Sequence, residues 1–561
     1  MASINNVVRP VGSQAKYHTA RNSLGILRAV IVTCRYSVST AHLRQQSFSL
    51  QDAIENALAT VVLGQAILRV GIAGEDTKEP AFVHLKTIDM DRMIEWEKTT
   101  MPVSAPDKQT EAGGDGRSKK EQDEAHCDDD LLRSLKKHHE ALWEDLASKP
   151  GWKIVVRHDP RQLSGLQSRE NDMLLSLDIS FCFHHAYSDG RGAYIFHGDL
   201  QRALNSGARP PELQDHTLHL PTPPALPPAM ETLIPFTLSW AFVLRTVWTE
   251  LLYPVFVPPL FRRLLRLEPS AADVPWTGAP VDGSNPKMHL RTLFAADEAQ
   301  LQRILARCRA HGASLTGLLN GLVARSLARL VEGRSFRSIT IIALASHADS
   351  AVAGAGAFTA GETIHCLVTS LSCAHGVDAV QQLRRRDEGA GEARACDDGG
   401  DEGDDDDDAT VWGFARDMTA QLRAKVASLP RDDILGLSGL IGDWHAFFRV
   451  KFGKARESTW EMSNLGSLSA VDAGAIASKP DDSLQMGGEK GVGEGRRWLI
   501  DRAIFTQGGN ATSAAMSVNV AGVTGHGIYV TVSWQDGIVN AELVDELARD
   551  LRACVIDHGQ A

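Results

Sequence analysis

The chain has 561 residues, of which 43% are hydrophobic and 23% are charged. This composition is typical of a globular protein, and the length exceeds that of one ordinary domain, so we expect two or more core-bearing units. The net charge is -12, but residues 387–408 carry twelve acids and one arginine and account for eleven of these charges. The rest is nearly neutral, which argues against a nucleic-acid partner.

The eight cysteines are scattered, and the sequence has no Cys-x-x-Cys pair and no Cys/His spacing suited to zinc. Cys34 and Cys182 lie within apolar runs, where a free thiol behaves as a small buried hydrophobe. Residues 1–13 contain no apolar stretch of the kind found in secretory signals. We therefore expect a reduced, cytoplasmic protein without a bound metal.

In the first half, apolar periodicity alternates between strand and helix. A polar, glycine- and acid-rich stretch at 104–130 predicts a disordered insertion. The predicted elements, in chain order, are a strand within 23–36, a helix at 50–62 capped by Ser49, a strand within 80–90, a helix at 131–148, a strand at 152–157, an alternating strand at 172–183 and a helix from Gly190 to about Asn205, with Gly207 as its stop.

A proline-rich connector at 210–228 leads into an apolar, aromatic stretch at 233–265. Prolines and charged residues interrupt this stretch, so it offers no uninterrupted apolar run long enough to span a bilayer. A crossover between two halves, or the aromatic wall of a channel, is the favoured interpretation. Peripheral membrane contact is the alternative, because Arg262, Arg263 and Arg266 follow the aromatic residues as in an interfacial segment.

The second half again mixes helices and strands, and its acidic run at 385–409 predicts a solvated, disordered loop. The predicted elements are strands at 288–294, 338–346, 460–465, 498–506, 514–520 and 528–534, and helices at 301–308, 315–323, 411–429 and 541–555. We expect a mixed α/β fold with an N-terminal unit at 1–225, a crossover at 226–285 and a C-terminal unit at 286–561.

One short motif carries the chemistry, and it follows the alternating strand at 172–183. Its pattern is His184-His185-x-x-x-Asp189-Gly190. A histidine at a strand end can be fixed by a nearby aspartate, while glycine lets the chain turn closely into a helix. A neutral histidine held in this way can take a proton from a hydroxyl or an amine. A buried, purely structural histidine pair is the competing interpretation.

The motif resembles the active-site motif of the chloramphenicol acetyltransferase-like (CAT-like) superfamily, which includes plant BAHD acyltransferases and peptide-synthetase condensation domains. Further stretches resemble the fungal alcohol acetyltransferases in particular. These are Arg9-Pro10-Val11-Gly12, Tyr17, Arg21-Asn22-Ser23-Leu24-Gly25, Ser463-Asn464-Leu465-Gly466 and Val532-Ser533-Trp534-Gln535-Asp536-Gly537. Two features depart from the pattern: Ala345-Ser346-His347 stands where the family often has an arginine, and the Asp-Phe-Gly-Trp-Gly element of plant members is absent.

The resemblance implies two CAT-like subdomains that enclose a central active-site channel. It implies that His185 is the general base and that Asp189 and Gly190 hold the geometry of the motif, with Asp189 paired to an arginine. Arg35 and Arg291 are the two candidate partners. We expect His184 only to pack.

Other site residues are candidates on chemical grounds. An oxyanion needs a donor, and Ser463, Asn464 and Ser533 are candidates, although turn chemistry explains them equally well. A cluster of cations, Arg449, Lys451, Lys454 and Arg456, is a candidate site for the phosphates of coenzyme A (CoA), with a solvated surface as the alternative. The run at 136–140 contains two histidines, and we expect an exposed helix face there, not a metal site.

We therefore predict an acyl-CoA-dependent O-acyltransferase that transfers acetyl from acetyl-CoA, as a co-substrate, to an alcohol. The acceptor is a small alcohol or a secondary-metabolite hydroxyl. The alternatives are N-acetyl transfer to an amine and a non-catalytic protein that keeps the channel. We expect a monomer in the cytoplasm, with peripheral attachment to the endoplasmic reticulum or to lipid droplets as an alternative.

Overall fold

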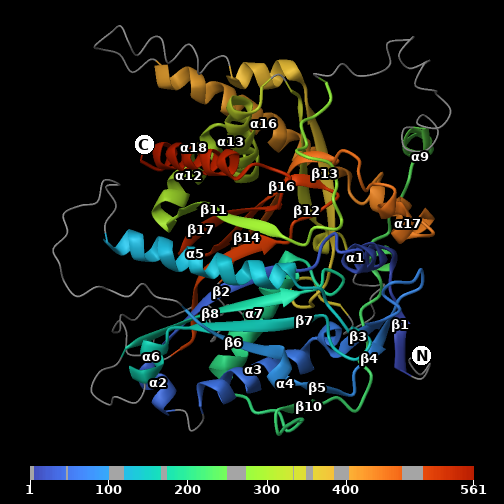
Figure 1. Cartoon of the computed structure of the whole chain (residues 1–561), viewed down its shortest axis with the longest axis vertical. Helices are drawn as coiled ribbons and strands as arrows, with labels where there is room; N and C mark the ends of the chain where they lie inside the picture. The colour runs from blue at the N-terminus through green and yellow to red at the C-terminus, as the bar shows by residue number, and fades with distance from the viewer. Residues whose placement is uncertain are drawn as a thin grey trace, which may run out of the picture.

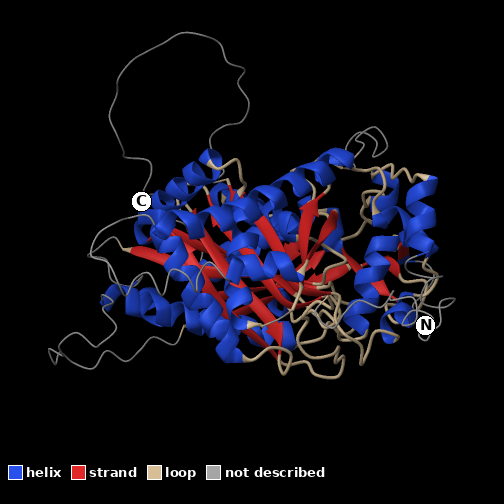
Figure 2. Ribbon diagram, turned by 90° about the horizontal axis from the view of Figure 1, so that it is seen from above, coloured by secondary structure: helices blue, strands red, loops and turns tan. Residues whose placement is uncertain are grey.

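Two large β-sheets lie next to each other, with helices packed around them in the computed structural model (Figures 1 and 2). The structure describes residues 6–45, 49–99, 119–165, 173–248, 273–332, 334–348, 358–384, 403–469 and 497–560. Strands and helices alternate in both halves of the chain, which agrees with the predicted mixed α/β class.

The first half contributes most of one sheet and the helices that cover it. Its elements are β1 (Val7–Pro10), α1 (Ser13–Ser23), β2 (Val30–Ser39), α2 (Thr40–Gln45), α3 (Leu50–Gly64), β3 (Val70–Ala73), β4 (Ala81–His84), β5 (Thr87–Asp89), α4 (Met90–Met93), β6 (Ile94–Lys98), α5 (Lys119–Glu140), β7 (Trp152–His158), α6 (Pro160–Gly165), β8 (Leu174–Phe183), α7 (Gly190–Ser206), β9 (Leu213–Gln214), β10 (Thr217–His219), α8 (Met230–Leu233) and α9 (Trp240–Val247).

The second half contributes the other sheet. Its elements are β11 (Met288–Ala296), α12 (Glu298–Ala310), α13 (Leu315–Leu330), β12 (Phe336–Ala343), β13 (Val368–His375), α16 (Gly403–Ser428), α17 (Trp444–Arg449), β14 (Ser458–Leu468), β15 (Leu499–Gln507), β16 (Ala514–Val523), β17 (Gly527–Gln535) and α18 (Ala541–Gln560). Helices α12, α13, α16 and α18 pack with this sheet around one apolar core.

The first sheet has the strand order β15-β2-β8-β7-β6. Strand β8, which leads into the motif, is central, because it pairs antiparallel with β2 on one side and with β7 on the other. Helices α3 and α7 pack against each other beside this sheet. The helix α3 begins with a capping box formed by Ser49 and Asp52, as its sequence predicts. The motif is therefore attached to the central strand of its sheet, which is paired on both sides.

The second sheet has the order β11-β17-β16-β14-β12-β13, with β14 parallel to both of its neighbours. The two sheets meet at β15, a strand of the second half that pairs with β2 of the first. The side chain of Thr531 on β17 donates to the carbonyl of Phe505 on β15 at 2.6 Å, and Gln507 donates to Asn519 at 2.9 Å. Since β15 belongs to the first sheet, the sheets do not follow the order of the chain, and the predicted unit boundaries stay a prediction.

Several sequence-based expectations need correction. Residues 13–23 form helix α1, and the strand expected within 23–36 runs from Val30 to Ser39. The end of the insertion predicted to be disordered belongs to α5, which begins at Lys119 and ends at Glu140, not at residue 148. The end of the acidic run predicted as a loop starts α16 at Gly403. Residues 104–118 and 385–402 lie outside the described residues.

Helix α9 projects from the body of the molecule at the right of Figure 1. It covers only the beginning of the predicted aromatic stretch, since residues 249–272 lie outside the described ranges. Within those ranges, no helix has both the length and the apolar character that a bilayer crossing requires.

Candidate active site

The His-His-x-x-x-Asp-Gly motif forms the turn between β8 and α7. The amide of His184 donates to the carbonyl of Gly151 at 2.8 Å, which ties the start of the turn to the neighbouring strand. Asp189 caps the first turn of α7, because its Oδ1 accepts the amide hydrogen of Gly192 at 2.8 Å. A side chain at Gly190 would force Leu465 to move, since a Cβ there would lie 2.2 Å from Cδ2 of this leucine.

His185 is held in one tautomer. Its Nδ1 lies 2.9 Å from the carbonyl oxygen of Ser188, which can only accept a hydrogen bond, so Nδ1 carries the proton. In the neutral ring, Nε2 then keeps its lone pair. Burial lowers the pKa of His185 to about 4, and the nearby cation of Arg21 lowers it as well. The imidazole is therefore neutral near pH 7 and able to accept a proton at Nε2.

His184 does more than pack. Its Nδ1 accepts the amide hydrogen of Ala186 at 3.0 Å, so the proton is on Nε2, which donates to Glu75 at 2.8 Å. The same carboxylate oxygen accepts from the side chain of Asn22 at 2.9 Å. His184 thus anchors the motif to helix α1 through Glu75.

Asp189 has no arginine partner among the described residues, which corrects the expectation from the family resemblance. Its Oδ2 accepts the amide hydrogen of Leu367 at 2.8 Å and lies 3.4 Å from Nδ1 of His365. Burial raises the pKa of Asp189, but His365 and the two amides outweigh this effect and keep the pKa below its usual value.

Both candidate arginines are engaged elsewhere. Arg35 pairs with Asp178 at 3.0 Å, directly across the ladder between β2 and β8. Arg291 pairs with Asp545 at 3.3 Å. The carboxylate of Asp189 instead joins α7 to the segment that precedes β13.

Helix α1 and Cys366 complete the surroundings of His185, and the sequence did not reveal either. The ring of His18 stacks on that of His185, with centroids 4.0 Å apart and planes 27° apart. The sulfur of Cys366 lies 3.7 Å from Nε2 of His18 and 3.6 Å from Nδ1 of His185. Arg21, one turn after His18, is also buried.

The sequence does contain a pattern that indicates α1, but its recurring residues are polar. The buried residues of this helix include Gln14, His18, Arg21 and Asn22, which recur at helical spacing. A search for apolar periodicity overlooks such a face. The family-like stretch that begins at Arg21 marked the region without giving these side chains a role.

Two sets of side chains in the described part of the chain could hold a metal ion. In the first set, His18, His185 and Cys366 offer ligand atoms within 4.8 Å of one another. The buried cation of Arg21 lies close enough to lower the pKa of both histidines, and the same charge disfavours a metal cation there. This set therefore gives no reason to assign a metal.

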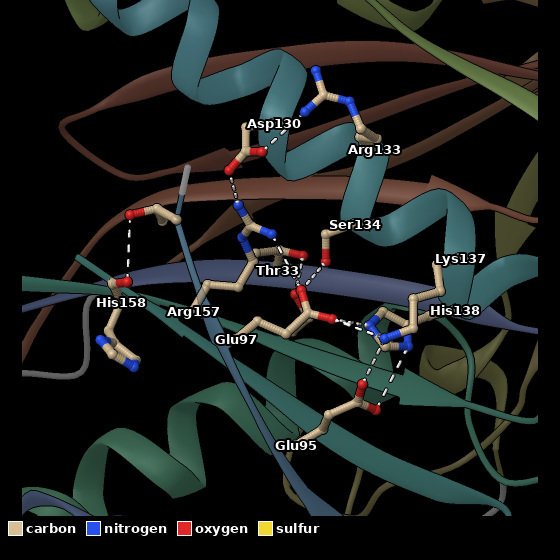
Figure 3. A network of polar contacts seen from close by, with 12 residues as sticks. Thr33, Glu95, Glu97, Asp130, Arg133, Ser134, Lys137, His138, Arg157 and His158 are labelled. Atoms are coloured by element: carbon tan, nitrogen blue, oxygen red, sulfur yellow. Dashed lines mark hydrogen bonds and ion pairs between the residues drawn. The ribbon is translucent and has the colours of Figure 1, made fainter. Parts of the chain in front are cut away.

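The second set joins His138, from the helix face that the sequence predicted to be exposed at 136–140, to Glu95 and Glu97 of β6 (Figure 3). That expectation is wrong for His138 and His139, which are both buried. His138 contacts Glu97 at 3.2 Å and, with neighbouring cations, holds the pKa of this carboxyl well below its usual value. Other side chains of the protein thus already balance the negative charges of these carboxylates.

Two of the predicted oxyanion residues, Ser463 and Asn464, lie on β14, and the third, Ser533, lies on β17. Asn464 donates to Thr316 at 3.1 Å and accepts the amide of Gly466 at 2.9 Å, as in a turn. Ser463 and Ser533 are buried within the second sheet. Among the described residues no hydrogen bond joins these three side chains to His185, and their proposed role stays a prediction.

The end of β14 nevertheless reaches the motif helix. Arg191 donates to the carbonyl of Leu465 at 2.9 Å, and the hydroxyl of Tyr194 donates to that of Gly466 at 3.0 Å. Together with the close packing of Gly190 against Leu465, these bonds place the His motif next to the family-like stretch 463–466.

The four predicted CoA-binding cations differ in their surroundings. Arg456 is buried and donates to Gln535 and to two main-chain carbonyls, so its guanidinium is already occupied. Lys451 pairs with Glu457. Arg449 and Lys454 are exposed, and they are the two members of the cluster that solvent surrounds.

Two hollows flank helix α1. One has an empty space of about 560 Å³, open mouth included, and is lined by Gln14 and Ala15 of α1 and by Cys366. The other has about 530 Å³ and is lined by Ser13 and Lys16 of the same helix. Helix α1 therefore lines both recesses, and the first of them also reaches the motif, at Ala186 and Tyr187.

No protein-family model matches the chain. The probable alcohol acetyltransferase FCK4 of Fusarium pseudograminearum is 26% identical over 572 residues, which cover 99% of this chain and 96% of that protein. The trichothecene 15-O-acetyltransferase TRI3 of Fusarium sporotrichioides has a similar structure, with a TM-score of 0.56 and 11% identity over 98% of this chain and 94% of that one.

The first condensation domain of the calcium-dependent antibiotic synthetase also matches, with a TM-score of 0.50 and 12% identity over 98% of this chain and 97% of that one. These similarities confirm the predicted fold class and the predicted resemblance. The chain accordingly has the CAT-like fold, and it is similar along nearly its whole length to a probable fungal alcohol acetyltransferase.

Proposed function

We propose that this protein transfers an acetyl group from acetyl-CoA to the hydroxyl of a small acceptor, with His185 as the general base. The observation that carries the proposal is the hydrogen bond from Nδ1 of His185 to Ser188, which leaves Nε2 as a proton acceptor. The names of the similar proteins, an alcohol acetyltransferase and a 15-O-acetyltransferase, support acetyl transfer to oxygen.

The reaction needs no covalent intermediate on the protein. The acceptor oxygen attacks the thioester carbonyl carbon while its proton moves to Nε2 of His185. The new C–O bond sends the carbonyl electron pair onto oxygen, which becomes an oxyanion. When the oxyanion collapses, the C–S bond breaks, and the departing CoA thiolate takes the proton from His185. The base is thereby restored for the next cycle.

Release of free CoA thiol tests the proposal. Purified protein is incubated with acetyl-CoA and a panel of alcohols and amines. We expect alcohol-dependent release that falls by about 10²–10⁴-fold in His185→Ala, the usual contribution of a general base. His311→Ala is the control, because this ring stacks on Trp412 at 4.2 Å, outside the motif, and should leave the rate unchanged.

Three other outcomes of this assay would lead to different conclusions. Unchanged alcohol-dependent release in His185→Ala would remove this residue from the mechanism. Release with amines alone would assign N-acetyl transfer. No release with any acceptor would favour a non-catalytic binding protein.

We also propose that Arg449 and Lys454 contact the phosphates of CoA. Both are exposed: Arg449 ends α17, and Lys454 lies between α17 and β14. The double variant Arg449→Gln/Lys454→Gln should raise the KM for acetyl-CoA and leave the KM for the acceptor unchanged. An unchanged KM for acetyl-CoA would show that the two cations are only a solvated surface.

Membrane contact through α9 is a further proposal. Trp240, Leu244 and Trp248 recur at four-residue spacing and are 81%, 64% and 51% exposed, so they form an apolar stripe toward solvent. Tryptophan suits the interfacial region of a bilayer. Flotation with liposomes tests this contact: wild type should float, and a variant with serine at all three positions should not. Wild type that stays in the soluble fraction would contradict it.

A cytoplasmic monomer stays a prediction. The six described cysteines are free, as is usual in a reducing compartment. Size-exclusion chromatography with light scattering would give the oligomeric state directly.

A further inference from the structure

Arg21 differs from the other buried arginines. Within the described ranges four arginines are buried, namely Arg21, Arg157, Arg456 and Arg502. Arg157 and Arg502 each pair with two carboxylates, and Arg456 donates to three oxygen atoms. Arg21 is 5% exposed, its Nε is enclosed, and no described residue accepts a hydrogen bond from its guanidinium or forms an ion pair with it.

An unpaired buried cation is unfavourable, because its hydration is lost and nothing replaces it. Arginine cannot escape this cost by losing its proton. The ring of Tyr17 lies 5.0 Å from the guanidinium carbon and stabilises the charge only modestly. The position therefore suits an anion that is present only when substrate is bound.

The place of Arg21 in the fold indicates which anion this is. Arg21 follows His18 by three residues, so the two side chains lie on the same face of α1. The ring of His18 in turn stacks on that of His185. The charge of Arg21 is close enough to lower the pKa of His185, His18 and Cys366. The guanidinium thus lies on the helix whose His18 stacks on the proposed base, within electrostatic reach of that base.

The carboxylate nearest in sequence to the base does not neutralise this cation. Asp189 is engaged by the amides of Gly192 and Leu367 and by His365, on the side of the turn that joins α7 to β13. The candidate oxyanion donor Asn464 is likewise satisfied, by Thr316 and Gly466. Arg21 is thus a buried cationic donor that no described residue occupies, on the same helix as His18.

We propose that Arg21 is the anion-binding residue of the active site and receives the negative charge that develops on the thioester carbonyl oxygen during acyl transfer. This assignment rests on the proposed role of His185. In the step described above, the electron pair of the carbonyl moves onto its oxygen as the proton moves to Nε2. A planar guanidinium offers that oxygen charge-assisted hydrogen bonds in a site with little water.

Steady-state kinetics of Arg21→Met and Arg21→Lys test the assignment, with acetyl-CoA and an accepted alcohol. Loss of one oxyanion donor typically lowers kcat by about 10²–10³-fold. We expect a fall of this size in Arg21→Met, with the KM of both substrates little changed, and a smaller fall in Arg21→Lys. Guanidinium ion added to Arg21→Ala should restore part of the rate, which a purely structural role would not allow.

Thermal unfolding separates this loss from misfolding. Arg21→Met removes an unpaired charge and should leave Tm unchanged or higher. Arg456→Met is the matched control: it leaves the carbonyls of Asn510 and Ala511 and the side chain of Gln535 without their donor and should lower Tm.

Two results would overturn the inference. One is an unchanged kcat in folded Arg21→Met. The other is a raised KM for acetyl-CoA with an unchanged kcat, because Arg21 would then bind an anion of the ground state, such as a CoA phosphate. In either case, wild-type turnover that is lost in His185→Ala would leave the proposed function intact.

Discussion

Removal of the Asp189 carboxylate should destabilise the protein more than the loss of an ordinary helix cap. The carboxylate accepts two buried amide hydrogens, from Gly192 and from Leu367, each at 2.8 Å. Loss of a cap costs about 1 kcal/mol. The amide of Leu367, buried and left without an acceptor, adds about 1–3 kcal/mol. We therefore expect Asp189→Ala to lower the free energy of unfolding by roughly 2–4 kcal/mol.

Urea unfolding of wild type and variant at pH 7 measures this difference. Asp297→Ala is the matched control, since Asp297 caps α12 at the surface, where water replaces the lost bond. Asp297→Ala should lower the free energy of unfolding by only about 1 kcal/mol. If both variants lose the same stability, the buried bond to Leu367 contributes nothing and the reasoning is refuted.

Three further predictions concern pH and packing. First, kcat/KM should stay constant from pH 8 to 6 and fall toward pH 4 as His185 takes up a proton, since its pKa is about 4; a midpoint near 6.5 would contradict this. Second, Gly190→Ala should lower stability by about 1–3 kcal/mol in thermal unfolding, because the new methyl group collides with Leu465; Leu465→Ala in the same chain should restore part of the loss. Third, burial lowers the pKa of His139 to about 3 and of His197 to about 4, so below pH 6.5 the unfolded chain takes up protons before the folded chain does. In urea unfolding, the free energy of unfolding should therefore fall by about 1.4 kcal/mol per pH unit for each histidine. A free energy of unfolding that is constant from pH 7 to 5 would refute this prediction.

Local sequence signals predicted the elements that deliver the motif. Strand β8 alternates and α7 ends at Gly207, which adopts a left-handed conformation with φ of 63°. The cap of α3 at Ser49 was also readable, because a cap depends on residues three positions apart. These features involve neighbours in the chain, and a pattern in the sequence contains them.

Long-range contacts were not readable in the same way. The pairing of β15 with β2 joins residues more than four hundred positions apart in the chain. The segment that supplies His365 and Leu367 to Asp189 carries no motif of its own. Which partner a buried carboxylate finds depends on how the two halves pack, and a sequence pattern does not encode that packing locally.

The sequence by itself predicted the class of reaction and the residue proposed as its base, because His185 sits in a motif that resembles the active-site motif of the CAT-like superfamily. Only the tertiary structure decided what surrounds this base. Helix α1 has a polar face without apolar periodicity, yet folding buries it and brings His18 and Arg21 to His185. The physical reason is that the energy and the function of a buried charge depend on the groups that surround it. The group around the proposed base comes from α1, from the turn after β8 and from the approach to β13, three segments that only the fold brings together.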